Sequence, residues 1–363
     1  MYLALRDLHF AKGRFVLMGG VVALITLLLV LLSGLTAGLG NQSTSALAAL
    51  PADQIVFGAP AGDSAKASFT ESEVTRTQLA DWAAREGVAN AGLLGISQSR
   101  FQALGPAAAP SGTASVAVFG TEGSGLAPGP VAEGTVVVGT SLAKELELQA
   151  GSRATVGGTE LTVSAVVPDQ WYSHTGVVWT TLGDWRKLAH ITGQDAAATV
   201  IAVTSDGQSL DVDAANAAAG TVSTTRDGSF QALGSYKSEN GSLLLMQAFL
   251  YGISALVIVA FLTVWTVQRT RDVAVLKALG ASSGYVLKDA MVQAAVVLLA
   301  GAVTGGAAGA AGGVLAAGAA PFLLTPETTL LPIAGIVVLG LAGAALAVRS
   351  ITRVDPLLAL GGS

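Results

Sequence analysis

The sequence contains no cysteine and carries little charge. Of its 363 residues, only 12% are Asp, Glu, Lys or Arg, and only three are histidines. The lack of cysteine excludes a disulfide scaffold and a cysteine-ligated zinc site. A typical soluble domain carries about 25% charged residues, so a wholly soluble chain is also excluded. The net charge of −5 argues against a nucleic-acid-binding protein.

Signatures of catalysis are missing as well. The sequence has no G-x-x-x-x-G-K-[ST] phosphate-binding loop, and its histidines (His9, His174 and His190) lack the H-x-x-x-H spacing of a catalytic zinc site. The stretch Gly280-Ala-Ser282-Ser-Gly284 matches the G-x-S-x-G nucleophile elbow, but that motif needs a histidine later in the chain. We therefore predict a protein that is not an enzyme and has no intrinsic cofactor.

Hydrophobic residues, which make up 52% of the chain, gather in four long runs. Each run is long enough to cross a hydrocarbon layer of about 30 Å as a helix. The first is too long for the apolar core of a cleavable signal peptide. The runs cover residues 15–39, 243–267, 290–320 and 331–348. The sequence therefore predicts four transmembrane helices, one N-terminal and three C-terminal.

The charges beside these runs predict the orientation of the chain. Residues 1–14, 268–289 and 349–363 together hold nine Lys or Arg against four Asp. The segment between the first two spans holds ten Lys or Arg against nineteen Asp or Glu. Basic residues favour the cytoplasmic ends of spans. We therefore expect a multi-pass protein of the cell membrane with both termini in the cytoplasm and residues 41–241 outside.

Three regions follow from this layout. Residues 1–40 hold the cytoplasmic N-terminus and span one, residues 41–241 form the extracytoplasmic domain, and residues 242–363 hold spans two to four with a cytoplasmic segment at 268–289. The outer region reads as mixed α/β, with short β-rich runs bounded by turn residues. Expected strands are 113–119, 135–138, 161–167, 177–181 and 199–204, and expected helices are 70–86 and 141–148.

The third span has small residues at a regular spacing. Glycines recur at every fourth position, at Gly301, Gly305, Gly309 and Gly313. This spacing lets two helix backbones approach closely in a membrane. The alternative is a general bias of the chain toward glycine and alanine. We favour tight packing within the chain, against span four or span two.

Two cytoplasmic stretches and one outer stretch carry a family resemblance. Gln268-Arg-Thr-Arg271-Asp-Val-Ala-Val-Leu276-Lys277-Ala-Leu-Gly280 follows the second span, and Arg353-Val-Asp355-Pro356-Leu-Leu-Ala-Leu360 follows the last one. The outer stretch begins at Val137-Val-Gly-Thr-Ser-Leu-Ala-Lys144. Together with the layout of one span, a large outer domain and three spans, they resemble the FtsX-like or MacB-like permeases of ATP-binding cassette systems.

The resemblance implies an assembly and a mode of action. It implies a homodimeric permease in contact with membrane lipid and with two copies of a separate ATPase subunit, which would hold ATP and Mg²⁺. The mode of action would be mechanotransmission, in which cytoplasmic motion reshapes the outer part of the protein. The segment after span two is compatible with a short amphipathic helix, which favours contact with the ATPase over an interfacial helix on anionic lipid. The residues assigned to this contact are Arg271, Val275, Leu276, Lys277, Leu279 and Gly280.

Within that family, the layout is most similar to HrtB-type permeases, which implies haem as the substrate. Tyrosine, histidine, methionine and glutamate side chains near the outer membrane boundary can approach haem iron. The expected substrate-binding residues are Tyr172, His174, Tyr236, Glu239, Met246 and Tyr251. Of these, Glu239, Met246 and Tyr236 are the expected iron ligands.

Other interpretations of these residues stay open. Aromatic residues at this level also serve as interfacial anchors, and a lone methionine also serves as packing filler. Two other functions are therefore kept. One is export of amphipathic peptides or lipids, and the other is an FtsX-like regulator that activates a cell-wall hydrolase without transport.

Overall fold

The computed structural model describes residues 12–60, 62–105, 110–123, 125–191, 196–268, 274–275 and 279–351. The chain divides into two compact units. The membrane unit comprises residues 1–39 and 241–363, and the outer unit comprises residues 40–240. The expected cytoplasmic motif at 353–360 lies outside the described residues.

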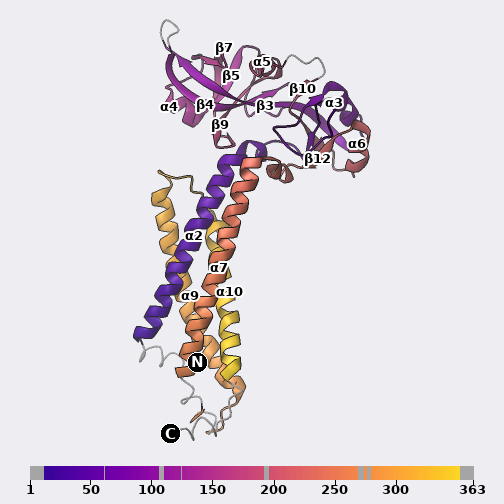
Figure 1. Cartoon of the computed structure of the whole chain (residues 1–363). Coiled ribbons are helices and arrows are strands. Elements are labelled where there is room, and N and C mark those ends of the chain that lie inside the picture. The colour runs from indigo at the N-terminus through magenta and orange to yellow at the C-terminus, as the bar shows by residue number, and fades with distance from the viewer. Residues whose placement is uncertain are drawn as a thin grey trace. The chain divides into compact units, whose positions relative to one another are not determined.

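The described part of the chain contains four helices that are long and apolar enough to cross a membrane (Figure 1). They are α2 (Lys12–Ala48), α7 (Gly234–Gln268), α9 (Ser283–Ala316) and α10 (Pro326–Ile351). This confirms the predicted arrangement of one N-terminal and three C-terminal spans. α2 continues nine residues beyond the apolar run that ends at Leu39. This extension contains no proline, and the helix continues through the single glycine at its start, Gly40.

The four helices share one apolar core. Its most buried residues come from all of them, including Leu29 of α2, Leu262 of α7, Leu298 of α9 and Ile336 of α10. Near the outer end of this unit, the Gln247 amide of α7 donates a hydrogen bond to the hydroxyl of Thr36 in α2, at 2.9 Å. The core therefore holds the helices together by packing and by an interhelical hydrogen bond.

The repeated glycines of α9 lie at close helix contacts. A Cβ on Gly305 would lie 2.0 Å from the carbonyl oxygen of Ala23 in α2, and Gly301 and Gly309 meet α2 in the same way. Gly313 faces a phenylalanine ring in the connection to α10. The sequence had favoured span four or two as the partner, whereas the partner of the first three glycines is span one. Span four packs on an adjacent face of α9, where Gly306 meets Ile333.

The outer unit is built from short strands and helices around a mixed sheet (Figure 1). The strands are β1 (Gln54–Phe57), β2 (Val74–Thr75), β3 (Val88–Leu104), β4 (Pro110–Thr121), β5 (Thr135–Gly139), β6 (Arg153–Val156), β7 (Thr159–Val167), β8 (Trp171–Tyr172), β9 (Thr175–Thr181), β10 (Ala196–Ala198), β11 (Val200–Ser205) and β12 (Val222–Thr225). The helices are α3 (Arg76–Ala83), α4 (Thr140–Glu145), α5 (Leu182–Leu188), α6 (Val212–Ala219) and the 3-10 helix η2 (Gly228–Ala232).

The strands follow the order β12-β1-β11-β3-β4-β9-β5-β7-β6, and β6 also pairs with β3. The second pairing closes β3, β4, β9, β5, β7 and β6 into a ring. One edge of the long strand β3 pairs with β11 at residues 88–94 and with β6 at residues 101–104. β3 therefore joins the ring to the three strands β11, β1 and β12.

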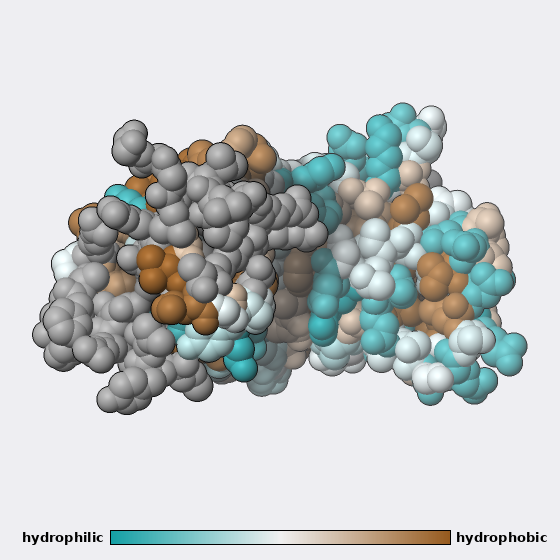
Figure 2. Space-filling model, turned by 90° about the horizontal axis from the view of Figure 1, so that it is seen from below, coloured by the Kyte–Doolittle hydropathy of each residue, from teal (hydrophilic) through white to brown (hydrophobic). Residues whose placement is uncertain are grey.

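Two hydrophobic cores cover the sheet. One includes Trp82 of α3 and Trp185 of α5, and the other includes Phe119, Tyr172 and Trp179. Figure 2 shows the part of the outer unit that carries α3, α6 and β12 as hydrophilic groups interspersed with neutral and hydrophobic ones. The large aromatic side chains of the two cores are directed inward, as in a water-exposed domain.

The structure contains strands at all five expected positions, but it differs from the expected helices. The helix expected at 70–86 begins only at Arg76, because Thr75 caps it with its side chain and Gln78 returns the bond to the backbone of Thr75. The strand β3 was not expected at all. Within the Gly280–Gly284 stretch, Ser282 caps α9, its side chain accepting from the Tyr285 N–H, so the stretch is a turn and a helix cap and not a nucleophile elbow.

Candidate functional site

The candidate site is built around the tip of the β8–β9 hairpin in the outer unit. Tyr172 pairs with Thr175, so Ser173 and His174 form a two-residue turn. Both turn residues have left-handed backbones, with φ of 50° and 63°. Such turns normally use Asn-Gly, because a β-carbon disfavours positive φ. Non-glycine residues held in this region cost about 1–3 kcal/mol each, so the surrounding contacts must offset the strain.

The imidazole of His174 connects two helix ends. Its Nε2 lies 2.9 Å from a carboxylate oxygen of Glu239 in α7 and 3.1 Å from the hydroxyl oxygen of Ser43 in α2. Because an ionised carboxylate only accepts hydrogen bonds, Nε2 carries the hydrogen in this arrangement. The side chains of His174 and Glu239 are 37% and 30% exposed, so water reaches the contact.

The backbone and the neighbouring serines add further hydrogen bonds to the same two helices. The N–H groups of Ser173 and His174 donate to the carbonyl oxygens of Ser43 and Gln42, both at 3.0 Å. The hydroxyls of Ser173 and Ser235 lie 3.1 Å apart, which links the turn to the start of α7. The hairpin tip is therefore bonded to α2 and to α7 by several groups at once.

The base of the hairpin is anchored in the outer-unit core. The ring of Tyr172 packs edge-on against Phe69 and Phe119, with centroid distances of 5.9 Å and 5.4 Å. Only 6% of Tyr172 is exposed, and burial raises the pKa of its hydroxyl. Tyr172 was expected to bind substrate, but its ring lies in the core and little of the residue is accessible to a ligand.

Tyr236 lies beside this cluster in the first turn of α7. Its ring meets Phe230 of η2 edge-on at 6.2 Å, and a Cβ on Gly40 would touch it at 3.6 Å. It is half-buried against the same core as Tyr172. Three of the expected substrate residues, His174, Glu239 and Tyr236, thus belong to one region of the outer unit.

The other two expected substrate residues belong to the membrane unit. Met246 of α7 is 57% exposed. Tyr251, also in α7, packs against α10, where a Cβ on Gly335 would lie 2.9 Å from its ring. Met246 therefore presents its thioether at a surface, whereas Tyr251 serves a helix contact.

His174 also borders a pocket of about 200 Å³ in the outer unit. Its lining combines the indole of Trp171 with the carboxylates of Glu145 and Asp169. Asp169 is engaged, because it accepts hydrogen bonds from the N–H and the hydroxyl of Ser141. Among the described residues, no three His, Asp or Glu side chains are grouped to hold a metal ion.

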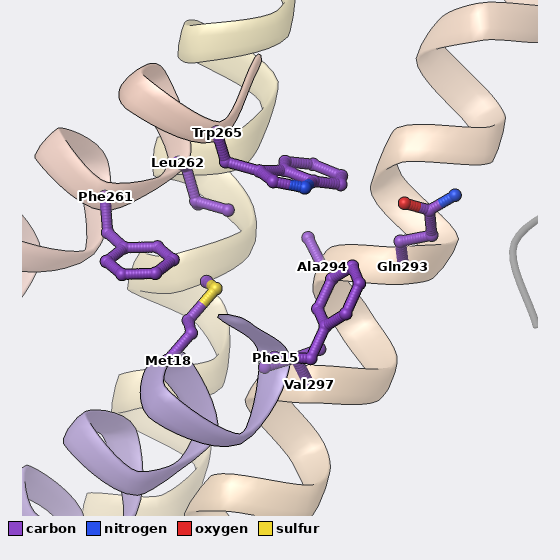
Figure 3. Close-up of a pocket in the computed structure, with 8 residues that line it drawn as sticks. All are labelled: Phe15, Met18, Phe261, Leu262, Trp265, Gln293, Ala294 and Val297. Carbon is purple, nitrogen blue, oxygen red and sulfur yellow. The ribbon is translucent and has the colours of Figure 1, made fainter. Parts of the chain in front are cut away.

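The membrane unit contains a second, smaller cavity (Figure 3). Phe15, Met18, Phe261 and Trp265 surround it, and the rings of Phe15 and Trp265 meet edge-on at 5.9 Å. The one amide in the lining, that of Gln293, donates to Asp289 at 3.0 Å. This cavity contains none of the residues expected to bind substrate.

The expected ATPase-contact segment is described only in part. Arg271, Leu276 and Lys277 lie outside the described residues. Val275 and Leu279 are joined by a helical hydrogen bond of 3.0 Å and are 46% and 80% exposed. Gly280 ends this turn with φ of 95°, which a residue with a β-carbon adopts only with strain. Two apolar side chains are thus exposed next to a glycine turn.

Two protein families match this chain. The MacB-like periplasmic core domain matches residues 15–221, which is more than half of the chain. The FtsX-like permease C-terminal domain matches residues 244–356. The two matches together cover both the outer unit and the C-terminal spans.

Individual relatives are similar over the whole chain or part of it. A hemin transport system permease protein HrtB of Staphylococcus epidermidis is 22% identical over 370 residues, covering 100% of this chain and 99% of its own. The protein of that name in Staphylococcus haemolyticus is 30% identical over 130 residues, or 36% of this chain and 37% of its own. The periplasmic region of MacB from Actinobacillus actinomycetemcomitans is similar in structure, with a TM-score of 0.36 and 12% identity over 50% of this chain and 92% of its own.

Proposed function

Since the chain belongs to the family of FtsX-like and MacB-like permeases of ATP-binding cassette transporters, we propose that it is the membrane subunit of an efflux system that removes haem from the cell membrane. The full-length similarity to a relative named as a hemin transport permease supports this substrate. The observation that carries the proposal is the cluster of His174, Glu239 and Tyr236 in one region of the outer unit.

The proposed haem contacts follow from the chemistry of these side chains. Glu239, Tyr236 and Met246 are the proposed iron ligands, because carboxylate, phenol and thioether groups all ligate iron. His174 is proposed as a contact beside Glu239. Tyr172 is left out because its ring is buried in the core. The proposed contacts of the outer unit are thus His174, Tyr236 and Glu239, and Met246 is a separate proposed contact on the membrane unit.

ATP is proposed to act from a separate subunit. Two ATPase copies would bind the cytoplasmic side of a homodimer of this chain, with Val275 and Leu279 among the contacts. Closure of the ATPases on ATP would move the spans and, through them, the outer unit, which is mechanotransmission. This places both termini in the cytoplasm and residues 41–241 outside, in line with the charge distribution.

The surface of α7 supports the proposed homodimer. It exposes the large apolar side chains Leu245, Phe249, Ile253 and Leu256 on successive turns. It is also the span least covered by the chain's own residues. We propose that this face meets lipid on one side and the second copy on the other.

Haemin titration of the purified protein tests the substrate. We expect a Soret band that saturates with haemin, and we expect Glu239→Gln or Met246→Leu to raise the Kd by about tenfold, as losing a metal ligand or its support does. Glu160→Gln is the matched control, because Glu160 is an exposed carboxylate of β7 paired with Arg153 and lies outside the proposed site. Haemin binding no tighter than to an unrelated membrane protein would contradict the haem proposal and favour peptide or lipid export.

Haemin sensitivity of cells tests transport. Cells that express the chain with its ATPase should tolerate more haemin than cells with an ATPase that binds but cannot hydrolyse ATP. Equal tolerance, together with a stably bound cell-wall hydrolase, would favour the regulator function.

A further inference from the structure

We propose that the tip of the β8–β9 hairpin is a clasp that ties the end of α2 to the start of α7 in the outer unit and opens during each working cycle. The clasp comprises Ser173 and His174 on the hairpin, Gln42 and Ser43 on α2, and Ser235 and Glu239 on α7. This inference rests on the proposed ATP-driven cycle, but not on haem being the substrate.

The contacts of the clasp join two helices that are far apart in the sequence. Ser43 and His174 are separated by 131 positions, and His174 and Glu239 by 65. The imidazole bonds to both helices, and the hydroxyl and N–H of Ser173 do the same from the neighbouring position. Both α2 and α7 continue along the chain into the membrane unit. A change in the separation of these two helix ends must therefore break some of these hydrogen bonds.

The backbone of the turn is strained, and the contacts of the closed clasp help to offset this strain. Both turn residues have positive φ, and neither is glycine or asparagine. Strained residues of this kind persist where surrounding contacts hold them, and they are common in switching segments. Once the contacts to α2 and α7 are lost, the turn is free to relax. The hairpin tip therefore favours two conformations, closed and open, over a continuous range of conformations.

The two ends of the hairpin differ in how firmly they are held. The base is fixed by the buried ring of Tyr172 and by the hydrogen bond from the Trp171 N–H to the Ser45 hydroxyl, at 2.9 Å. The tip is held by polar contacts, of which those to Glu239 and Ser235 on α7 are reached by water, whereas Ser43 on α2 is buried. Hydrogen bonds at hydrated sites contribute little net free energy each, so they open and close readily. The tip therefore moves while the base stays in the core.

The closed clasp also uses one atom that a ligand could take. In the closed state, one oxygen of Glu239 is bonded to His174. A substrate that takes this oxygen displaces the imidazole and favours the open state, whereas one that takes the other carboxylate oxygen leaves the clasp closed.

A reversible lock tests the requirement for opening. The natural chain has no cysteine, so Ser173→Cys with Ser235→Cys introduces a single pair at positions whose hydroxyl oxygens lie 3.1 Å apart. In the full complex with its ATPase, we expect oxidation of the cysteine pair to a disulfide to abolish haemin export. Reduction of the disulfide should restore it. Each single-cysteine variant under the same oxidant is the matched control. Undiminished export by the fully oxidised pair would overturn the proposal.

Hydrogen exchange tests the clasp without reference to the substrate. The amides of Ser173 and His174 are protected by their bonds to Ser43 and Gln42 in the closed state. In the complex that is hydrolysing ATP, we expect these amides to exchange about tenfold faster than in the nucleotide-free complex, with core amides such as that of Val178 unchanged. Unchanged exchange at both positions during ATP hydrolysis would overturn the clasp. If exchange accelerates while haemin has no effect, the substrate proposal fails and the clasp stands.

A pair of substitutions gives a second, independent check. His174→Asn keeps a residue that tolerates positive φ but removes the imidazole, and Glu239→Ala removes its partner. Each should raise the exchange rate of the Ser173 amide in the nucleotide-free complex, and the double variant should raise it no more than either single one. If the increases in the Ser173 exchange rate were fully additive in the double variant, the two side chains would act separately. This result would contradict a shared clasp.

Discussion

The contact between α9 and α2 leads to a quantitative prediction for Gly305→Ala. A β-carbon at this position would lie 2.0 Å from the carbonyl oxygen of Ala23. Carbon and oxygen atoms normally approach to about 3.3 Å, so the two helices must separate by about 1 Å. A gap of that size removes a quarter to a half of each atom-pair attraction of about 0.1–0.2 kcal/mol. Over the few dozen pairs along the contact, the loss is about 2 kcal/mol, within the usual range for overpacking.

Gly312→Ala is the matched control on the same helix. Its β-carbon would lie 3.6 Å from a methyl group of Leu31, an ordinary contact. Both substitutions gain the same helix propensity, about 1 kcal/mol in favour of alanine, so this contribution cancels between them. Their free energies of unfolding should therefore differ by about 2 kcal/mol, the alanine at 305 being the less stable.

Thermal unfolding of the full-length protein in lipid nanodiscs measures this difference. For a unit of this size, 2 kcal/mol corresponds to a Tm difference of about 4–8 °C. Wild-type protein sets the reference, and Gly312→Ala should unfold at or slightly above its Tm. Equal Tm values for the two alanine variants would refute the close α2–α9 contact, because the steric conflict would then be absent.

Two further predictions concern the stability of the outer unit. Gly95→Ala should lower the free energy of unfolding by about 1–3 kcal/mol, because its β-carbon would lie 2.2 Å from the Trp185 ring; a Tm equal to that of wild type would contradict this packing. Burial raises the pKa of Asp184, but hydrogen bonds from the Gly134 N–H and Lys187 outweigh it, and the net pKa is lowered from 3.8. Asp184 therefore stabilises the fold above about pH 4 and loses this effect as the pH falls through its lowered pKa. Asp184→Asn should be less stable than wild type at pH 7 and approach it at pH 2–3, whereas a Tm deficit independent of pH would contradict this.

The membrane spans were predictable because hydropathy and length are properties of a single segment. All four were found, whereas the orientation expected from the charge pattern stays a prediction. The end of α2 was not predictable from hydropathy, because an apolar run marks where the membrane is favoured and not where a helix stops. The helix continues through residues 41–48, which are polar or small except for Leu47, and ends before Pro51. The residues of α2 that contact the hairpin lie in this extension.

The strand β3 escaped prediction for a different reason. It contains Gln98, Ser99, Arg100 and Gln102 among its apolar residues, and it pairs with three other strands along its length. Gln98 and Arg100 are exposed to solvent, whereas Gln102 bonds to Thr155 of the neighbouring strand β6. Buried and exposed side chains therefore do not alternate regularly along the whole strand. The capping box at Thr75, in contrast, was a readable signal for the start of α3.

The sequence predicted some of the residues of the candidate site, but it did not predict how they are arranged in space. His174 and Glu239 were named from their chemistry, and the structure brings them to 2.9 Å. Ser43, Ser173 and Ser235 were missed, because serine is common in turns and helix ends and carries no signal alone. Positive φ at two consecutive non-glycine residues is also invisible in a sequence, since Ser-His is not a recognised turn signal.

α2 takes part in both proposed motions, the ATP-driven movement of the spans and the opening of the clasp. In the membrane unit it packs against the glycines of α9, where a rigid, close contact leaves little freedom to slide. In the outer unit its last turns hold the hairpin tip through hydrogen bonds at the buried Ser43 and at Gln42, each of which contributes about 1 kcal/mol. In the proposed cycle, a displacement of α9 would therefore carry α2 along, and the hydrogen bonds of the clasp would break. Loosening the α9 contact with Gly305→Ala should accordingly reduce the ATP-dependent exchange of the His174 amide, even though the two positions belong to different units. If that exchange stayed unchanged in a correctly folded variant, force would have to reach the hairpin through α7 instead.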